Sequence, residues 1–197
     1  GAADFACASA KGIAAFAQSR FAGDASFADG EFGDEARFAE ARFGGEAAFE
    51  RAEFEENALF RGAVFAGNAS FEGAEFDGRA GFGAVRFAAP ASFAAARVKG
   101  EADFAAARFS DARFQRARFR GPADFEGAAF AGNAVFSGLH AKSALTLAET
   151  RFAGAPDFLN ARIDQPPRLE NMRIDAPMRR FRRWGEGQRD PRPWLFR

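Results

Sequence analysis

The sequence has no tyrosine, one histidine and one cysteine among its 197 residues. The single cysteine, Cys7, excludes an internal disulfide and fits a reducing compartment. A zinc site or a thiol–imidazole pair needs clustered ligands, and His140 lies far from Cys7 in the chain. No apolar run approaches the roughly 20 residues that span a bilayer, and no phosphate-binding loop or dinucleotide fingerprint is present. These absences predict a non-enzymatic protein without cofactor or metal.

The chain also lacks net charge, because 27 basic residues balance 27 acidic ones. The balance argues against direct binding of nucleic acid by the chain as a whole. The charges are nevertheless unevenly distributed. Residues 1–85 hold 7 basic and 15 acidic side chains, residues 86–174 hold 13 and 9, and residues 175–197 hold 7 and 3. We therefore expect an acidic beginning and a basic end.

Phenylalanine is abundant, with 27 copies, and it recurs at alternating steps of five and six residues. These apolar anchors begin with Phe16, Phe21, Phe27, Phe32, Phe38, Phe43, Phe49, Phe54, Phe60 and Phe65. Two consecutive five-residue steps, at 109–118, interrupt the alternation, which continues in degraded form to Ile174. On a helix such anchors would lie roughly 140° apart at about 100° per residue, so they could not share one face. The spacing therefore predicts a coiling β-chain that turns a corner at each step.

A small residue precedes most anchors by two places, as Ala25 precedes Phe27 and Ala36 precedes Phe38. In an extended chain, residues two apart point to the same side. Both residues are therefore expected to point inward, where converging walls leave room only for alanine. Glycine recurs two places after many anchors, as at Gly62, and is expected to supply the positive φ of a tight corner.

These residues resemble the pentapeptide-repeat family, whose consensus places alanine two positions before a central leucine or phenylalanine. The resemblance covers about residues 14–174. It implies an all-β fold, a right-handed quadrilateral β-helix (β-solenoid) with four walls per coil. The six-residue steps depart from the usual pattern and predict about 22 residues per coil, hence roughly seven coils between Phe21 and Arg173. A left-handed hexapeptide helix is the alternative fold, and the five-residue steps argue against it.

We expect three segments. Residues 1–15, where Lys11 takes the place of an anchor, are interpreted as an irregular N-terminal coil or cap, with Cys7 as a small buried filler. Residues 16–174 form the solenoid. Residues 175–197 form a basic aromatic tail, interpreted as a C-terminal cap with a short helix at 177–184. The alternatives for the tail are an anionic membrane surface and nucleic acid phosphate.

Solvent-facing charges should stack in columns along the rod, because alternate units lie on one wall. One column reads Arg20, Arg42, Val64, Arg86, Arg108, Ala129, Arg151 and Arg173. The opposite column reads Glu31, Glu53, Glu75, Arg97, Arg118, His140 and Arg162, with His140 as a solvated side chain. A third column, at the corner with the extra residue, is expected to begin with Asp24, Glu35 and Glu46.

Three functions follow. The first is a non-catalytic interaction scaffold, a rigid rod that presents charged walls to an unidentified protein partner. The second rests on the resemblance, because some pentapeptide-repeat proteins mimic duplex DNA and bind DNA gyrase. The third is attachment of an otherwise cytoplasmic protein to a membrane surface through the tail. Whether the rod is a monomer or associates with a second copy stays open. The candidate interaction residues are Asp24, Glu31, Glu35, Glu46, Glu53, Arg86, Arg108, Arg179, Arg180, Arg182, Arg183 and Trp184.

Overall fold

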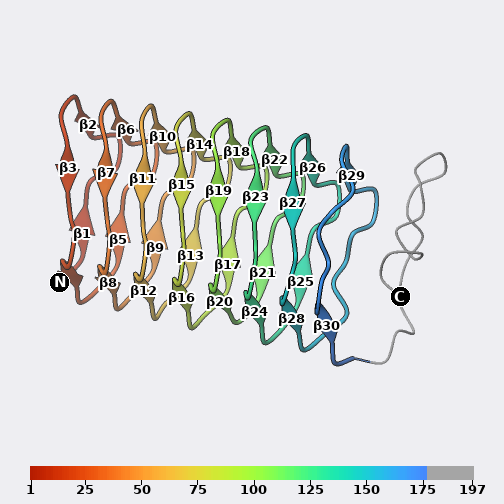
Figure 1. The fold of residues 1–197 in the computed structure, drawn as a ribbon. Coiled ribbons are helices and arrows are strands. Elements are labelled where there is room, and N and C mark those ends of the chain that lie inside the picture. The colour runs from red at the N-terminus through yellow and green to blue at the C-terminus, as the bar shows by residue number, and fades with distance from the viewer. Residues whose placement is uncertain (177–197) are drawn as a thin grey trace.

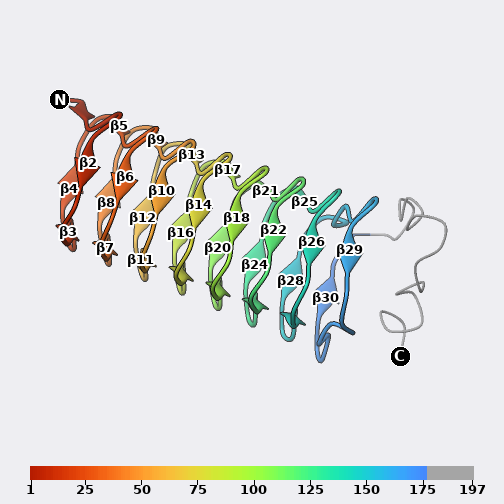
Figure 2. The ribbon, with the colours of Figure 1, turned by 90° about the horizontal axis from the view of Figure 1, so that it is seen from above.

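The structure is a computed structural model that describes residues 1–176, and every regular element in that range is a strand of two residues. The strands stack in parallel into four sheets, so that the chain winds as a four-walled β-solenoid (Figure 1). Seen from above, the coils follow one another from the N-terminal end of the rod to the C-terminal end (Figure 2). The predicted quadrilateral β-helix is confirmed.

Two walls, which we call A and C, begin each strand with the inward small residue and have seven strands each. Wall A consists of β1 (Ala3–Asp4), β5 (Ala25–Ser26), β9 (Ala47–Ala48), β13 (Ala69–Ser70), β17 (Ala91–Ser92), β21 (Ala112–Arg113) and β25 (Ala134–Val135). Wall C consists of β3 (Ala14–Ala15), β7 (Ala36–Arg37), β11 (Ala58–Leu59), β15 (Ala80–Gly81), β19 (Ala102–Asp103), β23 (Ala123–Asp124) and β27 (Leu145–Thr146).

The other two walls, B and D, begin each strand with an outward residue and have eight strands each. Wall B consists of β2 (Ser9–Ala10), β6 (Glu31–Phe32), β10 (Glu53–Phe54), β14 (Glu75–Phe76), β18 (Arg97–Val98), β22 (Arg118–Phe119), β26 (His140–Ala141) and β29 (Arg162–Ile163). Wall D consists of β4 (Arg20–Phe21), β8 (Arg42–Phe43), β12 (Val64–Phe65), β16 (Arg86–Phe87), β20 (Arg108–Phe109), β24 (Ala129–Phe130), β28 (Arg151–Phe152) and β30 (Arg173–Ile174).

The number of coils agrees with the roughly seven predicted between Phe21 and Arg173, and residues 1–19 add one more. The seven intervals expected between Phe21 and Arg173 are those that separate the eight strands of wall D. Residues 1–19 add β1, β2 and β3, which pair in register with β5, β6 and β7. The described residues therefore make about eight turns. The backbone of residues 1–15 is as regular as that of later coils, in contrast to the irregular coil expected there.

The core is a set of stacked phenylalanine ladders. Phe38, Phe60 and Phe82 on one ladder are fully buried, and neighbouring rings lie 4.8 Å apart and nearly parallel. This distance equals the spacing of paired strands, because each coil repeats the one before it. Rings from adjacent ladders meet edge to face, as Phe49 and Phe60 do at 5.3 Å and 90°. Offset and edge-to-face pairs of this kind add to the free energy gained by burying the rings.

The alanines two positions before the anchors point inward, as predicted. From Ala25 to Ala134 they are at most 3% exposed. The interior of a narrow coil is close-packed, and most of these places are therefore small. Val85, Leu139 and Leu145 occupy the same place in later coils and are buried there as well.

The corners alternate between two kinds. After each regular strand of wall A or C, four residues lead to the next strand of the chain. The third of these four residues has a positive φ, as Asp29 and Glu40 do. After most strands of walls B and D, three residues lead to the next strand. The six-residue step between anchors spans this second kind of corner, so the extra residue lies there. Glycine was expected to supply the positive φ at the corners that contain it, but among the glycines of residues 1–176 only Gly62, Gly73, Gly127 and Gly138 have a positive φ. Most corners of the first kind use other residues.

Irregularities are absorbed at corners. The ten-residue unit at 109–118 leaves only Ser110 and Asp111 between β20 and β21, and the walls stay in register beyond it. In the last coil, walls A and C shrink to single bridges, Val135↔Asp157 and Thr146↔Arg168. Pro156 and Pro167 take the inward places beside these bridges. In earlier coils the backbone N–H at this place donates to the following coil, as Ala112 N does to Asn133 O, and proline has no N–H to donate.

Candidate interaction surfaces

Wall D carries the predicted arginine column in register. Arg20 pairs with Arg42, and Arg86 pairs with Arg108, on adjacent strands. Arg86 and Arg108 are exposed, and within residues 1–176 neither makes an ion pair. Arg151, farther along, bonds to Asp175 at 2.8 Å. Like charges on adjacent strands repel, so the middle of this wall is an uncompensated positive surface.

Wall B carries the second predicted column, and its register is also confirmed. We call it the first row of wall B. From the N-terminal end, the first row consists of Ser9, Glu31, Glu53, Glu75, Arg97, Arg118, His140 and Arg162. Its charge changes from negative to positive between β14 and β18, where Glu75 bonds to Arg97. All acidic members of this row lie on one side of the boundary and all basic members on the other.

A second row on wall B was missed in the sequence, although the same period contains it. It lies two residues after the first row, on the far side of the inward anchor, so it faces solvent alongside the first. The second row consists of Lys11, Gly33, Glu55, Asp77, Lys99, Arg120, Lys142 and Asp164. Its sign changes at the same place, where Lys99 bonds to Asp77 at 2.7 Å. The two rows together divide wall B into an acidic half and a basic half.

The basic half ends in a small charge network. Asp164 accepts a hydrogen bond from Arg162 Nε at 2.7 Å and another from His140 Nε2 at 3.1 Å. The bond from Arg162, followed by that from His140, holds the pKa of the Asp164 carboxyl below its ordinary value. His140, expected to be solvated, is instead half-buried and paired. Asp164 therefore offsets part of the positive charge at this end of the wall.

The third predicted column is wrong. Asp24 and Glu46 do stack, and the backbone N–H of Glu46 donates to Asp24 Oδ1 at 2.8 Å. Glu35, however, lies at the corner that follows wall B, whereas the other two lie at the corner that follows wall D. Each coil contains two such corners on opposite sides of the rod, so only every second one belongs to a given column. Glu35 pairs locally with Arg37 at 2.5 Å.

Two further predictions concern the ends of the chain. Cys7, expected to be a buried filler, is exposed at a corner with φ of 57°. The tail residues Arg179, Arg180, Arg182, Arg183 and Trp184, with the cap helix expected at 177–184, lie outside the described residues.

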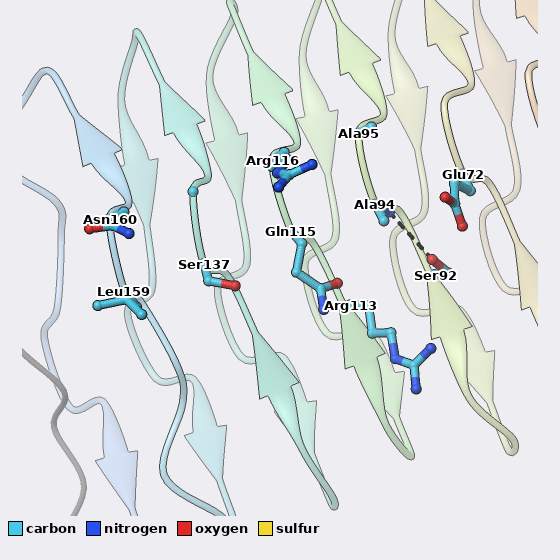
Figure 3. A pocket seen from close by; sticks show the side chains of 11 residues that line it. Glu72, Ser92, Ala94, Ala95, Arg113, Gln115, Arg116, Ser137, Leu159 and Asn160 are labelled. Carbon is cyan, nitrogen blue, oxygen red and sulfur yellow. Dashed lines mark hydrogen bonds between the residues drawn. The ribbon is translucent and has the colours of Figure 1, made fainter.

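Hollows on the surface of residues 1–176 include two that lie beside or over wall B. The larger, of about 700 Å³, follows the corner between walls A and B over several coils (Figure 3). Its side chains are mostly polar, and Glu72 is the one carboxylate among the lining residues. The smaller, of about 350 Å³, lies over the basic half of wall B. It is lined by Arg118, Phe119, Arg120, Gly138, Leu139, His140, Lys142 and Arg162. This composition suits an anionic surface better than an apolar ligand.

The described residues offer little for chemistry. No three His, Cys, Asp or Glu side chains in that range come together as metal ligands would. No helix among those residues has the length and apolar character to cross a membrane. Exposed charge on flat walls remains the main chemical feature of the part of the rod that the structure describes.

Comparison with known proteins gives one match to a family model. A model of pentapeptide repeats, spanning nine copies, matches residues 38–86, 49–97, 82–129 and 104–151, together more than half of the chain. No curated protein is significantly similar.

Solved structures that resemble the chain include two trypsin-treated variants of QnrB1, a plasmid-mediated fluoroquinolone resistance protein. They are 13% and 14% identical over 88% of this chain and 89% of theirs, with TM-scores of 0.27 and 0.23. Values this low carry no functional inference for this chain.

Proposed function

Because the chain belongs to the pentapeptide-repeat family, we propose that it is a non-catalytic interaction scaffold that presents a charged wall to a protein partner. The observation that carries this proposal is the division of wall B into an acidic half and a basic half. Both rows change sign at the same strand boundary, which chance placement of solvated charges would not favour. A rigid rod holds these charges at fixed spacing, so it can select a partner by electrostatic complementarity.

Rigidity supports this use of the wall. The outward side chains are carried by strands whose inward neighbours are stacked, buried rings such as Phe54 and Phe76. A surface that is ordered before binding loses little conformational entropy when it meets a partner. Complementary charges also speed the encounter and make it sensitive to salt.

The test is affinity capture from the source cell with the full chain and two matched double variants. In the wall B variant, Glu53→Gln and Arg118→Gln neutralise one charge in each half. In the wall D control, Arg86→Gln and Arg108→Gln remove two exposed arginines from the opposite wall. We expect a partner that is retained by the wild type and the control and is lost with the wall B variant. Equal retention by all three proteins would contradict the proposal.

A second candidate function is mimicry of DNA toward DNA gyrase or another DNA-binding protein. The observation that favours it is the acidic half of wall B, where Glu31, Glu53 and Glu55 make no ion pair within residues 1–176. Neutralising all three with glutamine should abolish any protection of purified gyrase from a quinolone, whereas Arg86→Gln should not. Failure of the wild type to change gyrase activity would exclude gyrase as the target of such mimicry.

A further inference from the structure

The charges of wall B are not only divided but antisymmetric about the boundary between β14 and β18. At the first, second and third strands on either side, the first row places Glu75, Glu53 and Glu31 opposite Arg97, Arg118 and His140. The second row behaves in the same way, with Asp77 and Glu55 on one side and Lys99 and Arg120 on the other. At its outermost positions the sign is reversed on both sides, with Lys11 at one end and Asp164 at the other.

We propose that wall B binds wall B of a second copy of this chain, with the two rods side by side and antiparallel. The two-fold axis would lie in the interface, parallel to the strands and between β14 and β18. This inference rests on the proposed function, because it names the partner of the same wall. A surface that pairs with itself around a two-fold axis must be complementary to its own rotated image, and wall B meets this condition.

The rotation reverses the order of the strands and leaves each row facing the same row of the second copy. Glu53 then faces Arg118 of the second copy, and Glu55 faces its Arg120. Lys11 faces Asp164 of the second copy, so even the reversed outer charges are matched. The remaining outer positions bring Ser9 to Arg162 and Gly33 to Lys142. No position in either row brings two like charges together.

The free rod has an electrostatic reason to associate in this way. Within one wall, Glu31 lies beside Glu53 and Arg97 lies beside Arg118, at the spacing of about 4.8 Å between paired strands. Like charges at this spacing repel. Glu53 and Arg118 make no ion pair within residues 1–176. The second copy supplies the missing opposite charge to both halves at once.

Wall D provides the contrast. Its outward charges, including Arg42, Arg86 and Arg108, are positive on both sides of the rod's middle. The same antiparallel pairing of wall D with itself would bring arginine against arginine, as Arg86 against Arg108 of the second copy. The strands of walls A and C carry fewer charges, namely Asp4 and Arg113 on wall A and Arg37, Asp103 and Asp124 on wall C. Among the four walls of the described residues, wall B is the one on which this rotation brings the most opposite charges together.

The first measurement is the mass of the full chain by sedimentation equilibrium over a range of concentrations, together with small-angle X-ray scattering. We expect a reversible dimer about as long as the monomer and twice as thick. Association should weaken as salt rises from about 0.1 M to about 1 M, because the Debye length falls from about 10 Å to about 3 Å. An end-to-end dimer, about twice as long as the monomer, would overturn the proposal, and so would a monomer at every concentration.

A charge swap then tests the orientation. Glu53→Arg alone, or Arg118→Glu alone, creates two like-charge contacts in the dimer by symmetry and should raise the dissociation constant by about tenfold or more. The double variant, Glu53→Arg with Arg118→Glu, restores opposite charges at both contacts and should recover most of the affinity. The control Arg86→Glu on wall D should leave the dissociation constant unchanged. Additive losses in the double variant would refute the antiparallel arrangement.

The two proposals fail in different ways. If the wild type stays monomeric but captures another protein through wall B, self-association is wrong and the scaffold function stands. If it dimerises as proposed and no other protein is captured, the scaffold acts through its own second copy. If it neither dimerises nor captures a partner that depends on wall B, both proposals are refuted.

Discussion

Individual glycines serve two distinct purposes in this rod. Gly127 has a φ of 65° and open space where a Cβ would be, so only its backbone conformation favours glycine. Gly121 has no positive φ, but a Cβ there would lie 2.2 Å from the carbonyl oxygen of Gly100 in the preceding coil. Residues other than glycine adopt the same positive φ in equivalent corners, among them Ala106 and Arg116. Asp34, Glu56 and Ser143 stand at the place of Gly121 in other coils, so the requirement set by contact between coils is local to Gly121, where it is the stricter of the two.

Replacing these two glycines by alanine should separate the two effects. Gly127→Ala should lower the free energy of unfolding by about 1 kcal/mol, the cost of a left-handed conformation for a residue with a Cβ. Gly121→Ala should lower it by about 2–3 kcal/mol, because the backbones of two coils must move apart. Urea denaturation of both variants gives the comparison. A larger loss for Gly127→Ala would show that the close approach of coils is unimportant.

At the scale of elements, strands and corners have different tolerance. A strand of two residues directs one side chain inward and one outward, so a shift by one residue would turn a ring such as Phe109 into solvent. The corner after β20 has already lost a residue without disturbing the ladder, since Arg108 still pairs with Ala129. Corners therefore absorb changes of length that strands do not.

Insertions of one glycine should show this difference directly. Between Ser110 and Asp111, an insertion restores the three-residue corner of the other coils and should leave the melting temperature nearly unchanged. Between Arg108 and Phe109, the same insertion shifts an inward anchor outward, and burial of one phenylalanine side chain alone is worth about 1.5–3 kcal/mol. Circular dichroism melts of the two variants provide the measurement. Equal melting temperatures would show that strands tolerate an inserted residue as well as corners do, contrary to this prediction.

At the scale of the whole molecule, each coil contacts mainly its neighbours. Stability in such a solenoid is approximately a sum of repeats and of the interfaces between them. The strand order shows this plainly, since β10 pairs only with β6 and β14. We therefore expect a rod of this kind to fold after a complete coil is removed and not to fold after part of a coil is removed.

Deletion of residues 54–75 joins Glu53 to Phe76 and preserves the pattern of outward acid followed by inward ring. We expect this variant to fold cooperatively, with a somewhat lower melting temperature and a shorter rod by about 4.8 Å. The matched control, deletion of residues 54–73, leaves Ala74 and Glu75 between these residues and puts the corner out of frame. Scattering and circular dichroism should find the first variant folded and the second unfolded. If both deletion variants fold, or if neither does, stability does not depend on removing a whole coil.

Much of this molecule was predictable because its order is local. The positions of Phe27, Phe38 and the other anchors, the inward alanines and the arginine column all follow from one period. The errors arose where the period alone is ambiguous. Glu35 was placed with Asp24, because two corners of one coil have the same sequence pattern but lie on opposite sides. Cys7 was expected inside, although the second residue after that anchor is an exposed corner position.

The sequence by itself determined the repeat, the anchors that are buried and the two columns of charge on walls B and D, because inward and outward places alternate along an extended chain. Only the tertiary structure decided which of the stacked neighbours form ion pairs and on which side of the rod each corner charge lies. Glu75 meets Arg97, and Asp77 meets Lys99, because residues a full turn apart in the chain are brought to adjacent strands. The two rows of wall B and their shared sign change arise from that stacking, since contacts between coils depend on how the chain closes each turn.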